Sequence, residues 1–112
     1  MYQVTLEFRQ RVINDLLLGH SSTGIKILDS PLSVERNGHP ARTFAEGEEV
    51  GWLVKDPFTQ QVTTRIGTII VFSQRQDGRG RQTAVATVAV ENSTEGPKRM
   101  SVPVEQLLKT TP

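Results

Sequence analysis

Residues 47–70, GEEVGWLVKDPFTQQVTTRIGTII, constrain the fold of this chain more than any other stretch. Gly47 precedes one apolar run, Asp56 and Pro57 interrupt it, and Gly67 precedes a second run. Asp and Pro favour turns, and Pro cannot donate a hydrogen bond to a strand ladder. The order therefore predicts two strands that reverse on each other through an irregular loop.

The size and composition of the chain limit what it can be. Its 112 residues suit one domain, residues 1–112, which is large enough to fold without covalent staples. The absence of Cys excludes disulfides, thiolate zinc sites and a cysteine nucleophile, and it fits a reducing compartment. The charged, alternating start lacks the apolar core of a signal peptide, and no apolar run approaches the roughly 20 residues of a membrane span. We therefore expect a cytoplasmic protein without a membrane partner.

The first 43 residues predict an N-terminal extension of mixed structure. Apolar residues alternate over residues 2–8, which predicts a strand, and they then recur at helical spacing over residues 9–18, before Gly19. A single helix over residues 6–18 is the competing interpretation.

A short strand and a hairpin are predicted next. Residues 24–28 form the strand candidate, and residues 32–36 and 39–44 flank the pair Asn-Gly. Asn-Gly accepts the positive φ angles of a type I′ turn, so it is a strong hairpin signal. Pro40 has no backbone N–H to donate to a strand ladder, so we expect the second hairpin strand to lie at a sheet edge.

Apolar patterns predict the strands of the main sheet. We expect strands at residues 49–55, 64–73, 83–91 and 100–104, then a tight 3₁₀-like turn in PVEQLL and a last short strand. The long central strand is apolar on both faces, with Ile66, Ile70 and Phe72 assigned to one face and Ile69 and Val71 to the other. Cover from a helix or from a partner subunit would explain the second apolar face. The expected core residues are Val50, Leu53, Ile66, Ile70, Val85, Val88, Val102 and Leu107.

Residues 44–108 resemble an SH3-like small β-barrel. GEEVGWLVKD matches the first strand, PFTQQVTTR the first loop, IGTIIVF the second strand and VPVEQLL the closing turn. The spacing G-x-x-V, D-P-F, G-x-I is also similar to KOW-type barrels of ribosomal and transcription proteins and to small barrel subunits of photosynthetic complexes. The resemblance implies a mainly β, α+β fold, either an SH3-like barrel or a curved antiparallel sheet. Its core would be residues 44–109, with residues 1–43 as an extension that carries one short helix.

No pattern in the chain indicates catalysis. His20 and His39 lie in separate polar turns, so we expect no metal site. There is no G-x-S-x-G element and no phosphate-binding glycine loop. Glu46, Glu48 and Glu49 flank a turn glycine, where we expect them to be solvated, whereas general acid–base catalysis uses buried carboxylates. We predict no catalytic residues, no metal and no cofactor.

A nucleic-acid hypothesis depends on basic residues in two turns. Arg75, Arg79 and Arg81 surround Asp-Gly in one turn and could contact phosphates, and Lys98 and Arg99 follow another turn. Antiparallel strands place those turns at opposite ends of the sheet, which weakens a single patch. The net charge of only +1 also makes us expect weak binding or none.

Two aromatic residues are candidates for an interface or a ligand groove. Trp52 lies on a predicted sheet strand, and Phe58 follows Asp-Pro at a predicted loop tip. We favour a non-catalytic binding or assembly module that self-associates or binds another protein. A weak nucleic-acid-binding barrel and a small-ligand site or minor enzyme activity in an interface groove are the alternatives.

Overall fold

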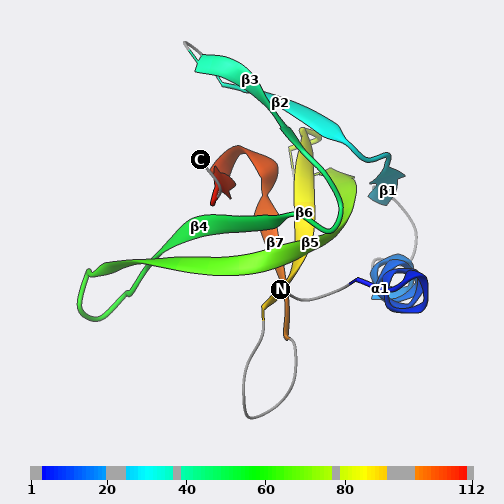
Figure 1. Ribbon diagram of the computed structural model, residues 1–112, viewed down its shortest axis with the longest axis horizontal. Helices are drawn as coiled ribbons and strands as arrows, with labels where there is room; N and C mark the ends of the chain where they lie inside the picture. The colour runs from blue at the N-terminus through cyan, green and yellow to red at the C-terminus, as the bar shows by residue number, and fades with distance from the viewer. Residues whose placement is uncertain (1–3, 20–24, 37–38, 77–78, 91–97, 111–112) are drawn as a thin grey trace.

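The computed structural model describes residues 4–19, 25–36, 39–76, 79–90 and 98–110, and it is mainly antiparallel β-structure with one helix (Figure 1). One sheet has the order β7-β6-β5-β4-β8, with β1 also paired to β5, and a second sheet contains β2 and β3. The elements are α1 (Leu6–Gly19), β1 (Ile25–Leu28), β2 (Leu32–Arg36), β3 (His39–Phe44), β4 (Glu49–Lys55), β5 (Val62–Gln76), β6 (Gln82–Val90), β7 (Lys98–Pro103), η1 (Val104–Gln106) and β8 (Leu108–Lys109). The expected α+β class is confirmed.

Helix α1 begins earlier than the favoured interpretation placed it. Thr5 caps the helix, because its Oγ1 accepts a hydrogen bond from the backbone N–H of Phe8 at 3.1 Å. Glu7 lies in the first turn, where its negative charge favours the helix dipole. The predicted strand over residues 2–8 is therefore wrong from Val4 onward, and the competing single helix from Leu6 is correct. Residues 2 and 3 lie outside the described residues.

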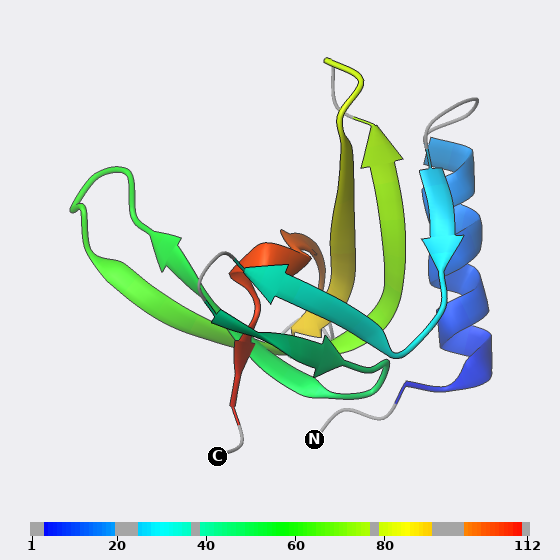
Figure 2. The ribbon, with the colours of Figure 1, turned by 90° about the horizontal axis from the view of Figure 1, so that it is seen from above.

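The strands of the main sheet follow the predicted order closely. Strand β4 matches its predicted bounds, and the predicted tight turn and last strand are confirmed as η1 and β8. Strand β5 is 15 residues long, longer at both ends than predicted, because its first half pairs with β4 and its second half with β6. Strand β8 returns to pair with β4 at Val50 and Gly51. Figure 2 shows the curvature of β5, yet neither sheet closes into a barrel within the described residues.

A β-bulge in β5 sets which residues face which side. Ile69 pairs with Val88 and Val71 pairs with Thr87, so Ile70 is an extra residue on β5. The extra residue shifts the alternation of side chains. Ile69 and Phe72 therefore face the main core, while Ile70 and Val71 both face the helix side. The predicted faces, which grouped Ile70 with Phe72, are wrong for this reason.

The main core lies inside the curved sheet. Its buried members are Phe44, Val50, Trp52, Ile69, Phe72, Ala86, Val88, Val102, Val104 and Leu107. The Trp52 ring lies over Gly67, where a Cβ atom would come within 3.1 Å of the ring. Of the eight predicted core residues, six are buried, but Leu53 and Ile66 are wrong because their side chains point outward and are about half exposed.

The β2–β3 hairpin covers an open end of the main core, as Figure 1 shows. The two predicted hairpin strands are confirmed, and the Asn-Gly turn lies outside the described residues. Pro40 lies in a two-stranded sheet, so β3 is an edge strand as predicted. Leu32 and Val34 pack against the main core, which makes the hairpin part of the folded body.

Helix α1 covers the other face of the sheet and lies alongside β1 and β5 (Figure 2). Val12 and Ile13 are buried against Ile70 and Val71, so the helix provides the cover that the second apolar face of β5 required. An ion pair joins Arg9 of this helix to Glu46, with Arg9 Nε 2.7 Å from Glu46 Oε1 and Nη2 3.1 Å from Oε2. The hydrogen bond to Glu46 raises the pKa of Arg9 above its ordinary value.

Candidate functional site

The outer half of the β4–β5 hairpin projects from the body of the molecule. Beyond Gly51, β4 has β5 as its only described strand neighbour, and β5 begins to pair with β6 only at Thr68. We call residues 52–67 the β4–β5 arm, and Figure 1 shows it extending at the left, away from α1. Because two strands alone form it, most residues of the arm are exposed.

The tip of the arm is an ordered turn. The backbone N–H groups of Phe58 and Thr59 donate to Asp56 Oδ1 at 2.8 and 3.3 Å. Asp56 N–H donates to the Gln61 carbonyl at 2.8 Å, which closes the loop, and Gln60 adopts a left-handed φ of 63°. The Asp-Pro pair that the sequence marked as a break therefore builds this turn.

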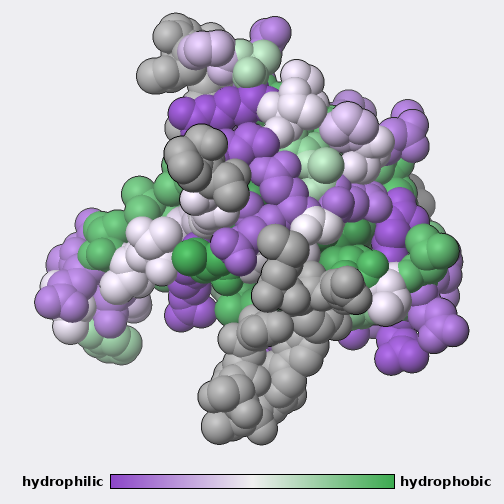
Figure 3. All heavy atoms as spheres, in the orientation of Figure 1, coloured by the Kyte–Doolittle hydropathy of each residue, from purple (hydrophilic) through white to green (hydrophobic). Residues whose placement is uncertain are grey.

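One face of the arm is apolar and exposed. Opposed residues of antiparallel strands share a face, and Leu53 lies opposite Thr64 while Val62 lies opposite Lys55. Leu53, Val62 and Ile66 lie on this face with exposed fractions of 56%, 58% and 51%. Figure 3 shows hydrophobic and hydrophilic side chains interspersed over the arm. Three apolar side chains exposed to water on one face of the arm add nothing to the stability of a monomer.

The structure separates the two aromatic candidates. Trp52 is 3% exposed and belongs to the main core, so it offers almost no surface to a ligand or to a second copy. Phe58 is 93% exposed at the tip of the arm. The pair does not form a groove, and only Phe58 can act as a contact residue.

The five basic candidates do not form one patch. Arg79 and Arg81 lie in the turn before β6, while Lys98 and Arg99 begin β7 at the opposite end of β6. Strand β6 has nine residues, which separates the two turns by roughly 27 Å at about 3.3 Å per residue. The nucleic-acid hypothesis stays a prediction, supported by single turns rather than a continuous rim.

Two of these arginines make contacts on the helix side of the sheet. The guanidinium of Arg75 donates from Nη2 to Ser101 Oγ at 3.3 Å. Arg99 Nη1 lies 2.5 Å from Asp15 Oδ2 of helix α1, and its guanidinium carbon is 6.0 Å from the centre of the Phe8 ring. Both guanidinium groups thus point toward the space between α1 and the sheet.

A cavity of about 290 Å³ lies in that space. Its lining residues are Val12, Asp15, Leu16, Thr87, Arg99, Met100 and Ser101. Sequence reasoning missed this site, apart from Arg99. The available signal was Thr87, a hydroxyl side chain in the middle of the apolar run TAVATVAVE.

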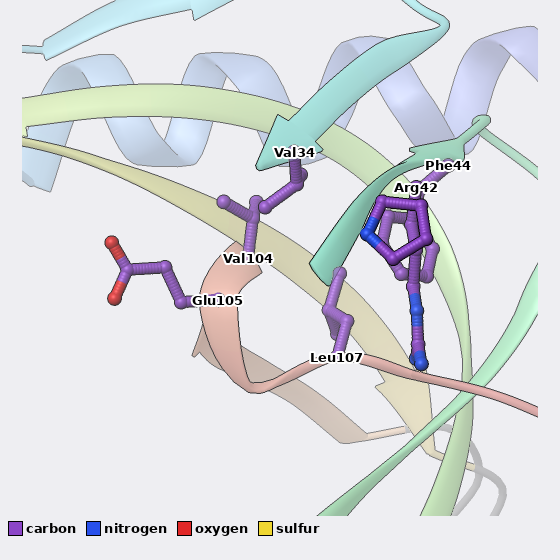
Figure 4. A pocket seen from close by; sticks show the side chains of 7 residues that line it. Val34, Arg42, Phe44, Val104, Glu105 and Leu107 are labelled. Carbon is purple, nitrogen blue, oxygen red and sulfur yellow. The ribbon is translucent and has the colours of Figure 1, made fainter. Parts of the chain in front are cut away.

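A smaller cleft of about 50 Å³ lies between the β2–β3 hairpin and η1. In Figure 4, Val34 and Val104 face each other across it, while the carboxylate of Glu105 points away from Arg42. Pro40, Phe44 and Leu107 complete its lining. The volume admits a water molecule or a methyl-sized group, so this cleft is too small for a metabolite.

The described residues contain neither a cluster of three or more potential metal ligands nor a helix long and apolar enough to cross a membrane. In comparisons with known proteins, no family model, no curated protein and no solved structure matched the chain. Fold and surface therefore define the chain as a small antiparallel α+β module with a projecting apolar arm.

Proposed function

We propose that this chain is a non-catalytic assembly module, built on an SH3-like fold, that associates with a second copy through the β4–β5 arm. The strand order supports the SH3-like assignment. Four consecutive strands form a meander, a 3₁₀ turn follows, and the final short strand pairs with the first strand of the meander. The long, bent β5 serves both halves of the sheet, as a small barrel requires.

The observation that carries the proposal is the exposed apolar face of the arm. Leu53, Val62 and Ile66 lie on one side of a two-stranded ribbon, and Phe58 extends from its tip. Burying such side chains contributes about 1.5–3 kcal/mol each when burial is complete. Helix α1 already covers the other apolar surface of β5, so the arm is where a partner gains most.

A second copy fits the arm because the outer edge of β4 is open within the described residues. Strand β8 pairs with β4 only at Val50 and Gly51, so Trp52 to Lys55 have no strand neighbour on their outer side within the described residues. An open edge is a template for pairing with another strand. Two arms related by a two-fold axis would pair these edges and cover both apolar faces with one self-complementary contact.

Sedimentation velocity over a range of protein concentrations tests this proposal. The wild-type chain should show a sedimentation coefficient that rises with concentration. The variant Leu53→Ser/Ile66→Ser/Phe58→Ser should sediment as a monomer throughout, because each change removes an exposed apolar contact without opening the core.

Leu18→Ser is the matched control. Leu18 is 77% exposed on helix α1, away from the arm, so this variant should associate like the wild type. A wild-type chain that stays monomeric at the highest attainable concentration contradicts the proposal, as does equal loss of association in the control.

A further inference from the structure

The cavity between α1 and strands β6 and β7 has the composition of a ligand site. Its volume of about 290 Å³ is near the lower end of the roughly 300–1,000 Å³ that small-molecule sites occupy. One wall is apolar, formed by Val12 and Leu16 of helix α1, and the sheet side carries hydroxyl and charged groups. Few polar groups set in an apolar lining are what orient a small ligand.

Thr87 is the first observation that points to a polar ligand. It lines the cavity, its residue is only 3% exposed, and its Oγ1 has no hydrogen-bond partner among the described residues. A buried hydroxyl without a partner costs about 1–3 kcal/mol. A valine would fill the same position without that cost, so the hydroxyl beside the cavity favours a polar ligand there.

Ser101 supplies a second donor beside it. It lies directly opposite Thr87 in the β6–β7 register, so both side chains share one face of the sheet. The Ser101 oxygen accepts a hydrogen bond from Arg75 at 3.3 Å. Its own proton is therefore available to donate into the cavity, and the Arg75 charge polarises that hydroxyl.

The charged groups around the cavity favour an anion. Arg75 and Arg99 contribute two positive charges, and Asp15, which pairs with Arg99, contributes one negative charge. Arg99 lines the cavity directly. After Asp15 offsets one of the two arginines, one positive charge remains. That charge and the hydroxyl groups of Thr87 and Ser101 suit an anionic group with two oxygen atoms that accept hydrogen bonds.

We propose that this cavity binds a small organic carboxylate. Its carboxylate oxygens accept hydrogen bonds from the hydroxyls of Thr87 and Ser101 and lie beside the guanidinium of Arg99. Its apolar body packs against Val12 and Leu16 of helix α1. This site is separate from the β4–β5 arm, and its test does not depend on self-association.

Titration with benzoate, followed by ¹H–¹⁵N NMR, tests the site. Benzoate should cause saturable shifts of the Thr87 and Ser101 amides at concentrations up to about 20 mM, well above the roughly millimolar Kd of a weak small ligand. Benzylamine, a cation of similar shape, and inorganic phosphate, an anion without an apolar body, should shift these amides much less. No saturable shift with benzoate, or equal binding of benzylamine, overturns the proposal.

Two hydroxyl deletions separate binding from folding. Thr87→Val should keep the fold and weaken benzoate binding by about tenfold or more, because hydrogen bonds to charged groups are among the strong ones. Ser73→Ala is the control, since Ser73 Oγ is also buried and unpartnered among the described residues, but Ser73 does not line the cavity. Unchanged binding in Thr87→Val, or equal weakening in both variants, overturns the proposal.

Discussion

Replacing Gly67 by Ala tests the packing of the core beneath Trp52. A Cβ atom on Gly67 would lie 2.9 Å from the carbonyl oxygen of Ala89 and 3.1 Å from the Trp52 ring. The oxygen belongs to the paired backbone of β6, so it cannot move without distorting the sheet. The Trp52 ring is 3% exposed and enclosed by the main core, so it has little room to shift.

The free energy of unfolding should fall by about 1–2 kcal/mol. Overpacking a well-packed core costs about 1–3 kcal/mol. The lower conformational freedom of an unfolded chain with Ala offsets about 0.4–1 kcal/mol of that cost. For a chain of this size, each kcal/mol corresponds to a change in Tm of about 4 °C, so the expected decrease is about 4–8 °C.

Thermal and urea unfolding, followed by circular dichroism, measure this change, and the fluorescence of Trp52, the single Trp of the chain, gives a second probe. Gly51→Ala is the matched control, because Gly51 lies on the partner strand and its nearest neighbour, the Arg65 carbonyl oxygen, is 3.3 Å from the added Cβ. We expect a loss below about 0.5 kcal/mol there, since the smaller clash is offset by the entropic gain. Equal stability of Gly67→Ala and the wild type, or an equal loss in the control, would refute the packing argument.

Two further predictions concern the helix contact and the core. A double-mutant cycle with Arg9→Met and Glu46→Gln should give a coupling free energy of about 0.5–1 kcal/mol, because the pair is bidentate but partly exposed, and this coupling should shrink in high salt. A coupling indistinguishable from zero at low salt contradicts it. Val88→Ala should cost about 2–3 kcal/mol in urea unfolding, since two methyl groups leave the buried core, whereas Leu53→Ala on the exposed arm should cost less than about 0.5 kcal/mol. Comparable losses for both variants would show that the arm is not exposed as described.

Local sequence signals determined most of the strand pattern. The Asn-Gly pair, the Asp-Pro break and the alternation that begins at Met100 depend only on neighbouring residues. The β2–β3 hairpin, the loop between β4 and β5 and most of β7 could therefore be located without the fold. The tight turn before β8 could be predicted for the same reason. Gly47 was also marked as a turn residue, and its φ of 88° is one that glycine adopts readily.

The start of the helix required tertiary information. Alternation over residues 2–8 is compatible with a strand, and local pattern alone left both interpretations open. The Thr5 cap and the contact of the helix with β5 favour the helix, because most helical stability comes from packing an apolar face. The ion pair of Arg9 with Glu46 joins residues 37 positions apart, which no local pattern reveals.

The direction of side chains was decided only by the assembled sheet. The bulge at Ile70 interrupts the alternation of side chains along β5. Side chains after the bulge therefore point to the opposite face from the one that strict alternation predicts. Leu53 and Ile66 are exposed because the arm extends past the strands that would have covered them. The cavity beside Thr87 has the same origin: it combines groups from α1, β6 and β7, which the chain brings together only when the helix packs across the sheet. Apolar pattern specifies which segments are strands, whereas burial depends on neighbours that are distant in the chain.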